Sequence, residues 1–379
     1  MFPVNKPQIT DLDIESVSQA LQSGWISGEG PIVQEFESKF AGFVNRKFGI
    51  AVSNGSIALD LVFESLNLPE GSEVILPSFA IISCLAPILR QGLTPVFVDA
   101  DIVTWNVDME DVYQAVTPRT SAILMVHTYG LGIPLTELSD FCAKRGLFLI
   151  EDAAEAHGVL VDGKKCGSFG NVSTFSFYAN KLITSGEGGM VVTDDDNFSE
   201  RLRSLRNLAF KKDQRFVHDE LGFNYRLSSM QAALGLSQLA RIHEAVSHRI
   251  LIAETYQKNL RYQNLFSFQP NQTEFSRNIY WVVGILLNAD VAKYKQEIID
   301  GLESKGVQTR PFFYPLNRQP VLKKFGISLS TSNPNSENLY ERGFYLPTGN
   351  GYQIKDILSI CRIFNDLCDL IFFEKNGAN

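Results

Sequence analysis

Residues 173–195 read STFSFYANKLITSGEGGMVVTDD. Two apolar runs typical of buried strands, Ser173–Tyr178 and Gly189–Thr193, flank a short polar segment in this stretch. Lys181 is the only cation in that segment, and the glycine-rich sequence SGEGG follows it almost at once. The pattern predicts a lysine held on a loop between two strand ends. An ordinary solvated loop lysine would show the same local pattern. The rest of the chain is needed to distinguish a functional lysine from a solvated one.

Apolar runs alternate with helical stretches along the first half of the chain. The runs with strand character are Glu73–Leu76, Thr94–Val98, Ala122–Val126 and Leu147–Ile150, and the helical stretches are Ile57–Leu66, Ile81–Gln91 and Leu135–Arg145. This alternation predicts an α/β fold with a mostly parallel central sheet that is covered by helices on both faces.

The pattern changes beyond a long helical stretch at Ser228–Leu260. A strand is expected at Tyr280–Leu287, a helix near Tyr294–Lys305 and a closing helix after Ile354. We therefore predict a large domain over residues 1–240, with an N-terminal arm, and a smaller C-terminal α+β domain over residues 241–379.

Composition limits the classes of partner. The chain has 379 residues, 45% of them hydrophobic and 20% charged, with a formal net charge of −8. An acidic chain without a Lys/Arg block argues against a nucleic-acid partner. No window approaches the roughly 18 apolar residues of a membrane span, and no secretory signal pattern opens the sequence, so we expect a cytoplasmic protein without a membrane partner. The five cysteines contain no CxxC pair, and no metal site is expected.

Two further segments place polar groups where predicted strands end. In GLFLIEDAAEAHG the apolar run stops at Glu151 and Asp152, and in AVSNGSIALDL a short strand turns into a helix through Gly55 and Ser56. Ligands of open parallel sheets collect at the carboxyl ends of the strands. Taken alone, the acids could be solvated loop residues and the turn an ordinary helix cap.

Together with Lys181, these groups could bind a single kind of cofactor. A lysine with apolar and uncharged neighbours loses proton affinity and becomes an amine nucleophile toward an aldehyde. A carboxylate can keep a pyridine nitrogen protonated, and the free N–H groups of a helix N-terminus bind phosphate. These three needs are those of pyridoxal phosphate.

Five segments in order also resemble a known family: SNGSIALDL, EDAAEAHG, FSFYANKLITSGEGGMV, GFNYRLSSMQAALGLSQL and RPFFYP. They closely resemble the sugar aminotransferases of the DegT/DnrJ/EryC1 group, over about residues 3–365. The resemblance implies the fold-type-I architecture of the aspartate aminotransferases, pyridoxal phosphate as cofactor and L-glutamate as amino donor. Within the group the segments are most similar to the GDP-perosamine synthases, which aminate the 4-keto carbon of GDP-4-keto-6-deoxymannose for surface-polysaccharide synthesis.

The resemblance also implies roles for particular residues. Lys181 is expected to form the Schiff base with the cofactor, and Asp152 to pair with its pyridinium nitrogen. Glu155 corresponds to a residue near the ring hydroxyl. The expected phosphate-binding residues are Gly55, Ser56, Ser176 and, from a neighbouring subunit, Asn224. That last expectation implies a homodimer with a shared active site.

Residues expected to contact the sugar are Trp25 and Ser27 of GWISGEG and Arg310 and Tyr314 of TRPFFYP. Packing or a surface ion pair would also account for Trp25 and Arg310.

Two departures from the family pattern leave the identity of the sugar open. SFAIISC places Ile81 where relatives carry an aromatic residue that stacks on the cofactor ring, and HTYGL places Leu131 where perosamine synthases often carry a polar residue. A different keto- or aldehydo-sugar, with or without a nucleotide, remains an alternative. A sugar dehydratase and a non-catalytic regulatory protein are further alternatives, although related dehydratases carry histidine in place of the lysine.

Overall fold

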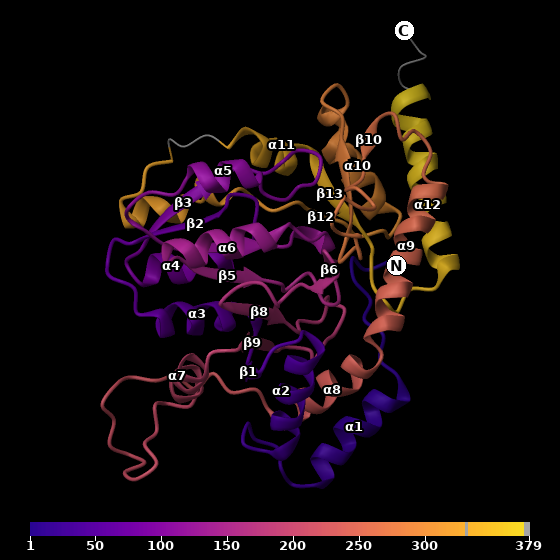
Figure 1. Cartoon of the computed structure of the whole chain (residues 1–379). Coiled ribbons are helices and arrows are strands. Elements are labelled where there is room, and N and C mark those ends of the chain that lie inside the picture. Colours follow the sequence, from indigo (N-terminus) through magenta and orange to yellow (C-terminus); the bar gives the residue numbers. More distant parts are fainter. Residues whose placement is uncertain (330–332, 375–379) are drawn as a thin grey trace.

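The computed structural model describes residues 1–329 and 333–374 (Figure 1). Its centre is a seven-stranded sheet with the order β1-β9-β8-β5-β4-β2-β3. These strands are β1 (Phe48–Val52), β2 (Glu73–Pro77), β3 (Thr94–Val98), β4 (Thr120–Val126), β5 (Phe148–Asp152), β8 (Val172–Ser176) and β9 (Gly189–Thr193). Only β9 runs against the other six, since it is antiparallel to β1 and β8 while the remaining pairs are parallel. The predicted mostly parallel α/β sheet is confirmed.

Helices bury both faces of this sheet, which explains why most residues in the middle of its strands are apolar. On β4, Leu124 and Val126 belong to the buried cluster that includes α3, α4 and α7, whereas Ile123 and Met125 belong to the cluster that includes α2, α6 and α8. The helices of this part are α1 (Asp11–Gln22), α2 (Pro31–Phe43), α3 (Gly55–Leu66), α4 (Ala86–Arg90), α5 (Met109–Gln114), α6 (Leu135–Arg145), α7 (Asp196–Arg206) and α8 (Ser229–Ala240), with the short 3₁₀ helices η1 (Ile82–Cys84) and η2 (Thr128–Gly130).

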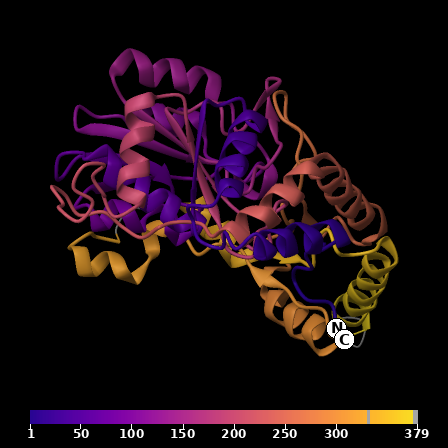
Figure 2. The same cartoon turned by 90° about the horizontal axis from the view of Figure 1, so that it is seen from below.

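A second, antiparallel sheet lies to one side of the first, together with α9, α10 and α12 (Figures 1 and 2). Its strands, in the order β10-β11-β13-β12, are β10 (Phe266–Ser267), β11 (Val283–Leu287), β13 (Gly343–Leu346) and β12 (Arg310–Pro311). The helices of this part are α9 (Ile242–Asn259), α10 (Lys295–Ser304) and α12 (Ile354–Asp369), with the short helices η3 (Ala292–Tyr294) and η6 (Leu370–Glu374). Between β12 and β13 the chain returns to the first part through η4 (Leu316–Arg318), η5 (Pro320–Phe325) and α11 (Pro334–Arg342), since Leu316, Leu322 and Leu339 belong to the core clusters of the seven-stranded sheet (Figure 1). The second part has its own hydrophobic core. The small hairpin of β6 (Leu160–Val161) and β7 (Lys164–Lys165) is separate from both sheets.

Several predicted elements match the observed ones. The strands Thr94–Val98 and Gly189–Thr193 and the helix Leu135–Arg145 have the bounds expected from the sequence. The helical stretch Ser228–Leu260, in contrast, consists of two helices, α8 and α9, which meet at Arg241.

Two other elements are shorter than expected. The stretch Ile81–Gln91 contains a 3₁₀ turn followed by the five-residue α4, with Pro87 in its first turn. Proline lacks the N–H that a continuous helix needs at that position, but it is tolerated where a helix begins. The strand expected from Tyr280 begins only at Val283, because Tyr280 has a φ of 55° in the left-handed region.

The division into domains at residue 240 stays a prediction. The positions of the two sheets support it, since the strands of the seven-stranded sheet precede residue 194 and those of the four-stranded sheet follow residue 265. The first residues nevertheless pack against the second part: Phe2 pairs with Val307, and the carbonyl oxygen of Val4 accepts a hydrogen bond from Thr348 N at 2.9 Å.

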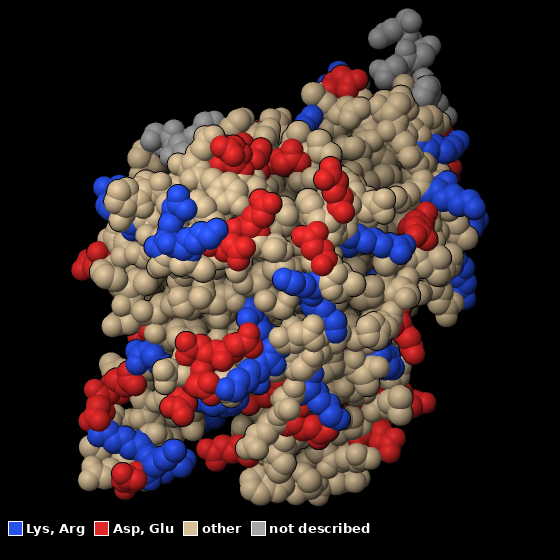
Figure 3. All heavy atoms as spheres, in the orientation of Figure 1, with Lys and Arg blue, Asp and Glu red and all other residues tan. Residues whose placement is uncertain are grey.

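The surface carries charges of both signs. On the face shown in Figure 3, the Lys and Arg side chains lie close to Asp and Glu side chains. Within residues 1–329 and 333–374, no helix combines the length and the apolar character needed to cross a membrane.

Candidate active site

A cavity of about 500 Å³ lies at the carboxyl ends of β4, β5 and β8. Six residues predicted from the sequence line it: Gly55, Ser56, Asp152, Glu155, Ser176 and Lys181. The cavity therefore brings together side chains from the start of α3, the end of β5, the end of β8 and the loop before β9. This is the place where open parallel sheets bind ligands.

Lys181 points its amine into this cavity between two groups. Its Nζ lies 3.7 Å from Glu155 Oε1 and 3.7 Å from the centre of the Trp281 ring, and its side chain is only 10% exposed. Burial lowers the pKa of Lys181, and the carboxylates of Glu155 and Asp152 partly oppose that shift. A buried amine of lowered pKa releases its proton more easily than a solvated one, which is a requirement for nucleophilic and proton-transfer chemistry.

Asp152 ends β5 and is 4% exposed. Its Oδ1 accepts a hydrogen bond from Ala154 N at 3.0 Å, and the thiol of Cys84 lies 3.4 Å from Oδ2. Burial raises the pKa of Asp152 above its ordinary value, although Ala154 N–H and Lys181 partly oppose this. A buried carboxylate with only a weak thiol donor on one oxygen favours a further cationic N–H partner, as a pyridinium nitrogen would be.

The start of α3, which also lines the cavity, offers a cradle for an anion. Asn54 caps α3 and accepts the N–H of Ile57 at 2.9 Å, while the first-turn N–H groups of Gly55 and Ser56 have no hydrogen-bond partner among the described residues. A Cβ at Gly55 would lie 2.7 Å from the Cβ of Ser176, so only glycine permits this close approach. Free N–H groups at a helix N-terminus bind phosphate. The residues present therefore fit pyridoxal phosphate at both of its ends.

Glu155 is held beside the lysine by the backbone. Its Oε2 accepts a hydrogen bond from Tyr129 N at 2.8 Å, which leaves Oε1 directed at Lys181. Burial raises the pKa of Glu155, and Lys181 and the Tyr129 N–H partly oppose the shift.

The other predicted site residues do not line the cavity of their own chain. Asn224 is exposed and pairs with Asn207 through the backbone. Trp25 is 55% exposed, and the carbonyl oxygen of Ser27 accepts hydrogen bonds from Ser229 at the start of α8.

Arg310 and Tyr314 lie on and just after β12. The guanidinium of Arg310 is exposed and donates only to the neighbouring Thr309 carbonyl among the described residues, at 3.0 Å. Tyr314 is 38% exposed and packs edge-on against Tyr340. The proposed roles of these residues and of Asn224 therefore need either a bound substrate or a second subunit.

Sequence reasoning missed several residues of the cavity wall, among them Tyr178, Asn180, Trp281 and Phe313. Tyr178 and Asn180 stand next to Lys181 in the quoted segment and could have been found from that proximity. Trp281 and Phe313 come from the second half of the chain. Phe313 stands in the RPFFYP segment, next to Tyr314, and could have been found from it, whereas no local pattern marks Trp281.

The two departures from the family pattern have different positions. Ile81 lines the cavity mouth and is 46% exposed, so a residue at this position can face a bound ligand. Leu131, in contrast, is fully buried and does not line the cavity. The side chain at this position therefore lies in the packed interior and does not face the cavity.

A buried hydrogen-bond network surrounds Glu151, the residue before Asp152 at the end of β5. Glu151 accepts hydrogen bonds from His127 Nε2 at 2.8 Å, Ser173 Oγ at 3.0 Å and three backbone N–H groups. Because His127 Nδ1 accepts the N–H of Ile133, its Nε2 carries the hydrogen that Glu151 receives. Cys166 completes a cluster with metal-ligand spacing, but the histidine and carboxylate atoms already have these partners. The cluster is a structural hydrogen-bond network.

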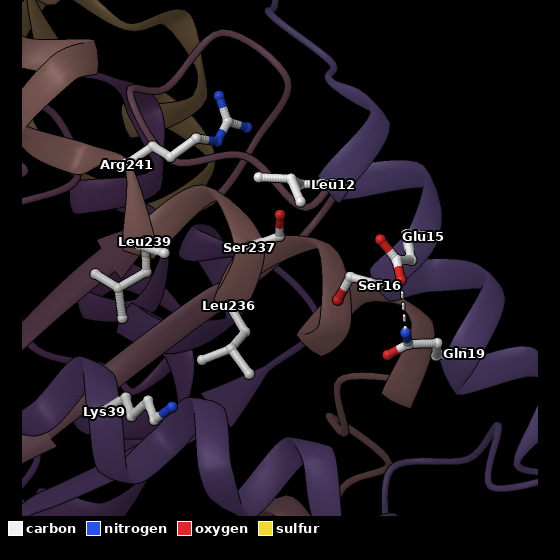
Figure 4. A pocket seen from close by; sticks show the side chains of 10 residues that line it. Leu12, Glu15, Ser16, Gln19, Lys39, Leu236, Ser237, Leu239 and Arg241 are labelled. Carbon is white, nitrogen blue, oxygen red and sulfur yellow. Dashed lines mark hydrogen bonds between the residues drawn. The ribbon is translucent and has the colours of Figure 1, made fainter.

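A second hollow of about 410 Å³ lies between α1 and α8 (Figure 4). Its lining combines apolar side chains, such as Leu12 and Leu236, with polar and charged ones, such as Glu15, Gln19 and Lys39. None of the residues predicted for catalysis or cofactor binding lies in it.

A buried lysine, a buried carboxylate and an open helix N-terminus around one cavity, on a mostly parallel sheet, define a pyridoxal-phosphate-dependent enzyme of fold type I. The chain belongs to the DegT/DnrJ/EryC1/StrS aminotransferase family, whose model matches residues 7–365. The predicted family, the fold class and the cofactor are thereby confirmed.

Two curated relatives are similar over nearly their whole length. The chain is 36% identical to GDP-perosamine synthase of Escherichia coli O157:H7, over 96% of this chain and 98% of that protein, and 34% identical to GDP-perosamine synthase of Vibrio cholerae, over 98% and 100%. Among solved structures, the E. coli GDP-4-keto-6-deoxy-D-mannose-3-dehydratase with bound hydrated pyridoxal phosphate superimposes with a TM-score of 0.88 at 26% identity, covering 96% of this chain and 99% of that chain.

Proposed function

We propose that the protein transfers an amino group from L-glutamate to the 4-keto carbon of a nucleotide-linked 4-keto-6-deoxy sugar, with GDP-4-keto-6-deoxymannose as the substrate. Surface-polysaccharide amino-sugar synthesis is the process that such a product serves. The observation that carries the aminotransferase assignment is the enclosure of Lys181 with Asp152 and Glu155 in one cavity. The near-full-length similarity to two GDP-perosamine synthases supports the choice of sugar.

Bound pyridoxal phosphate supplies an electron sink for the negative charge that develops on the substrate carbon. The chain supplies the binding and the proton transfer. Asp152 would accept the hydrogen bond of the ring nitrogen, and the N–H groups of Gly55 and Ser56 would bind the phosphate. In the first half of the reaction the Nζ of Lys181 would take the proton from the α-carbon of L-glutamate and pass it to the cofactor, two proton transfers that free 2-oxoglutarate and leave the amino group on the cofactor. In the second half it would carry a proton in the opposite direction, onto C4 of the sugar that receives the amino group.

A dehydratase of the same fold is the second candidate, since the solved structure compared above is one. Dehydratases of the family carry histidine where this chain has Lys181, which favours the aminotransferase. Another keto- or aldehydo-sugar remains the alternative substrate, because Ile81 alters the mouth of the cavity.

The complete site is proposed to form in a homodimer. Support comes from Asn224, whose side chain is exposed and lies outside the cavity of its own chain. The exposed apolar side chains of the N-terminal region, Ile9, Leu12, Ile14 and Trp25, offer a surface for a second copy.

The substrate proposal is tested by direct assay. The purified, cofactor-loaded protein is incubated with L-glutamate and GDP-4-keto-6-deoxymannose, and 2-oxoglutarate and the amino sugar are quantified against Lys181→Ala as control. We expect equal amounts of both products and ping-pong kinetics. Release of 2-oxoglutarate with a different keto-sugar but not with this one would keep the aminotransferase and reject the proposed substrate. Loss of the sugar's 3-hydroxyl without amination would favour the dehydratase.

The shared site is tested by mixing two inactive variants, Lys181→Ala and Asn224→Asp. Each hybrid dimer then has one site with both lesions and one site with neither, so activity should partly return. If mass measurement confirms subunit exchange between folded variants and no activity returns, Asn224 acts within its own chain.

A further inference from the structure

The amine of Lys181 lies directly over an aromatic ring. Its Nζ is 3.7 Å from the centre of the Trp281 ring, a distance at which an ammonium ion is attracted by the negative face of an indole. The nearest carboxylate oxygen, Glu155 Oε1, is 3.7 Å away, which is longer than an ordinary charged hydrogen bond. The ring face is therefore at least as close a partner of the amine as the acid is.

The ring of Trp281 is held in place from several sides. Its Nε1–H donates to the carbonyl oxygen of Asn180 at 3.0 Å, the residue that precedes Lys181. Its backbone N–H donates to Tyr129 O at 3.0 Å, and its carbonyl oxygen accepts a hydrogen bond from the buried guanidinium of Arg249. With 4% of its surface exposed, the side chain has little freedom to leave this position.

The contact also joins the two parts of the chain. Trp281 precedes β11 of the second sheet, whereas Lys181 follows β8 of the first. The backbone of Trp281 comes so close to Gly130 that a Cβ there would lie 2.6 Å from Trp281 N, and Gly130 has a φ of 99°. A glycine is required for this approach, which brings the indole over the lysine.

We propose that Trp281 is a positioning residue for Lys181: its indole face holds the free amine as an ammonium ion over the cavity and favours the protonated form between the two proton transfers. This inference rests on the assignment of Lys181 as the proton-transferring lysine. An uncharged ring suits this role, because it stabilises the ammonium ion less strongly than a further carboxylate would, so the amine can still release its proton.

Several titratable or charged groups from other elements also act on the Lys181 amine: Glu155, Asp152, Cys84, His157 and Arg249. Burial lowers the pKa of Lys181 most, Arg249 lowers it further, and the two carboxylates raise it. The attraction of the Trp281 ring for the ammonium ion acts in the same direction as the two carboxylates and favours the protonated amine. Removal of the ring should therefore lower the pKa of Lys181.

The test measures the protonation of Lys181 in the cofactor-free protein. The rate of acetylation of Lys181 by acetic anhydride is followed as a function of pH by mass spectrometry, in the wild type, Trp281→Phe and Trp281→Leu. Only the neutral amine reacts, so the midpoint of the profile reports its pKa. From the usual strength of a cation–π contact, we expect Trp281→Leu to lower the midpoint by about 0.4–1.5 pH units and Trp281→Phe by less.

Phe313→Leu is the matched control, because it removes an aromatic ring from the same cavity without removing the ring over Lys181. Its midpoint should stay at the wild-type value. An unchanged or raised midpoint in folded Trp281→Leu overturns the proposal. A ring that only shields Lys181 from the reagent would change the maximal rate of acetylation and leave the midpoint where it is. Should Trp281→Leu fail to fold, an unchanged midpoint in Trp281→Phe overturns it instead.

Added pyridoxal phosphate should protect Lys181 from acetylation. Failure of that protection would count against the assignment of Lys181 and so against the proposed function. The midpoints of the cofactor-free variants are independent of that result.

Discussion

Replacing Asp152 with asparagine should leave the cofactor-free protein as stable as before, or more stable, while it weakens the binding of the cofactor. The shape of the side chain is kept, and the amide oxygen can still accept the N–H of Ala154, now at 3.0 Å. Burial raises the pKa of Asp152 above the ordinary 3.8, so the ionised carboxylate costs stability at any pH above that value. The cofactor-free variant should thus be at least as stable as the wild type near neutral pH. This advantage should disappear as the pH falls below 3.8, where both forms are uncharged.

The cofactor-bound protein should respond in the opposite direction. A hydrogen bond between charged groups is worth about 1.5–3 kcal/mol, so cofactor binding should weaken by roughly 10- to 150-fold. The stabilisation that the cofactor provides falls by the same free energy. With an unfolding entropy of about 2.1 cal/mol/K per residue, the cofactor-induced rise in Tm should shrink by about 2–4 °C. Turnover should fall by several orders of magnitude, because the electron sink needs the protonated ring nitrogen.

Thermal unfolding with and without pyridoxal phosphate, together with the rate of 2-oxoglutarate release, checks these expectations. Asp213→Asn, which removes the same charge from an exposed position, serves as control and should change neither quantity. The reasoning is refuted if the cofactor-free Asp152→Asn is clearly less stable than the wild type near neutral pH. An undiminished cofactor-induced rise in Tm, with a rate loss below about tenfold, would show that another acid pairs with the ring nitrogen.

Three other substitutions test neighbouring parts of the site. Lys181→Ala should abolish turnover while the circular dichroism spectrum stays native, and a rate above a few per cent of wild type would remove Lys181 from its role. Gly55→Ala places a Cβ 2.7 Å from that of Ser176, so the free energy of unfolding should fall by about 1–3 kcal/mol and cofactor binding should weaken. An unchanged denaturant midpoint would contradict the close packing. Glu151→Gln should cost about 1–3 kcal/mol near neutral pH, because the amide NH₂ cannot accept the hydrogen bonds that one carboxylate oxygen receives from buried donors such as His127 or Phe169 N–H. Although burial alone would raise the pKa of Glu151, its hydrogen bonds lower it below 4.5, so the difference from wild type should shrink as the pH falls below that value; a pH-independent difference would contradict the role of the charge.

The place of the site and its three main residues could be predicted from the sequence. Lys181 between two strand ends, Asp152 at the end of an apolar run and Gly55 at the start of a helix each belong to a local pattern, and each lines the same cavity. These positions are predictable because strand ends and helix starts depend on neighbouring residues, and the carboxyl ends of parallel strands meet at one edge of the sheet.

Other features depend on contacts between distant residues, and only the tertiary structure decided them. The helical pattern of residues 228–260 gave no sign of the break at Arg241, where the side chain binds Asp13 of α1. Trp281 stands 101 positions from Asn180, to which its indole is hydrogen-bonded. Hydrophobic periodicity assigns a buried tryptophan to the core, but it does not say which group the ring will meet. That partner is set by how the second sheet packs beside the first, and this packing places the ring over Lys181.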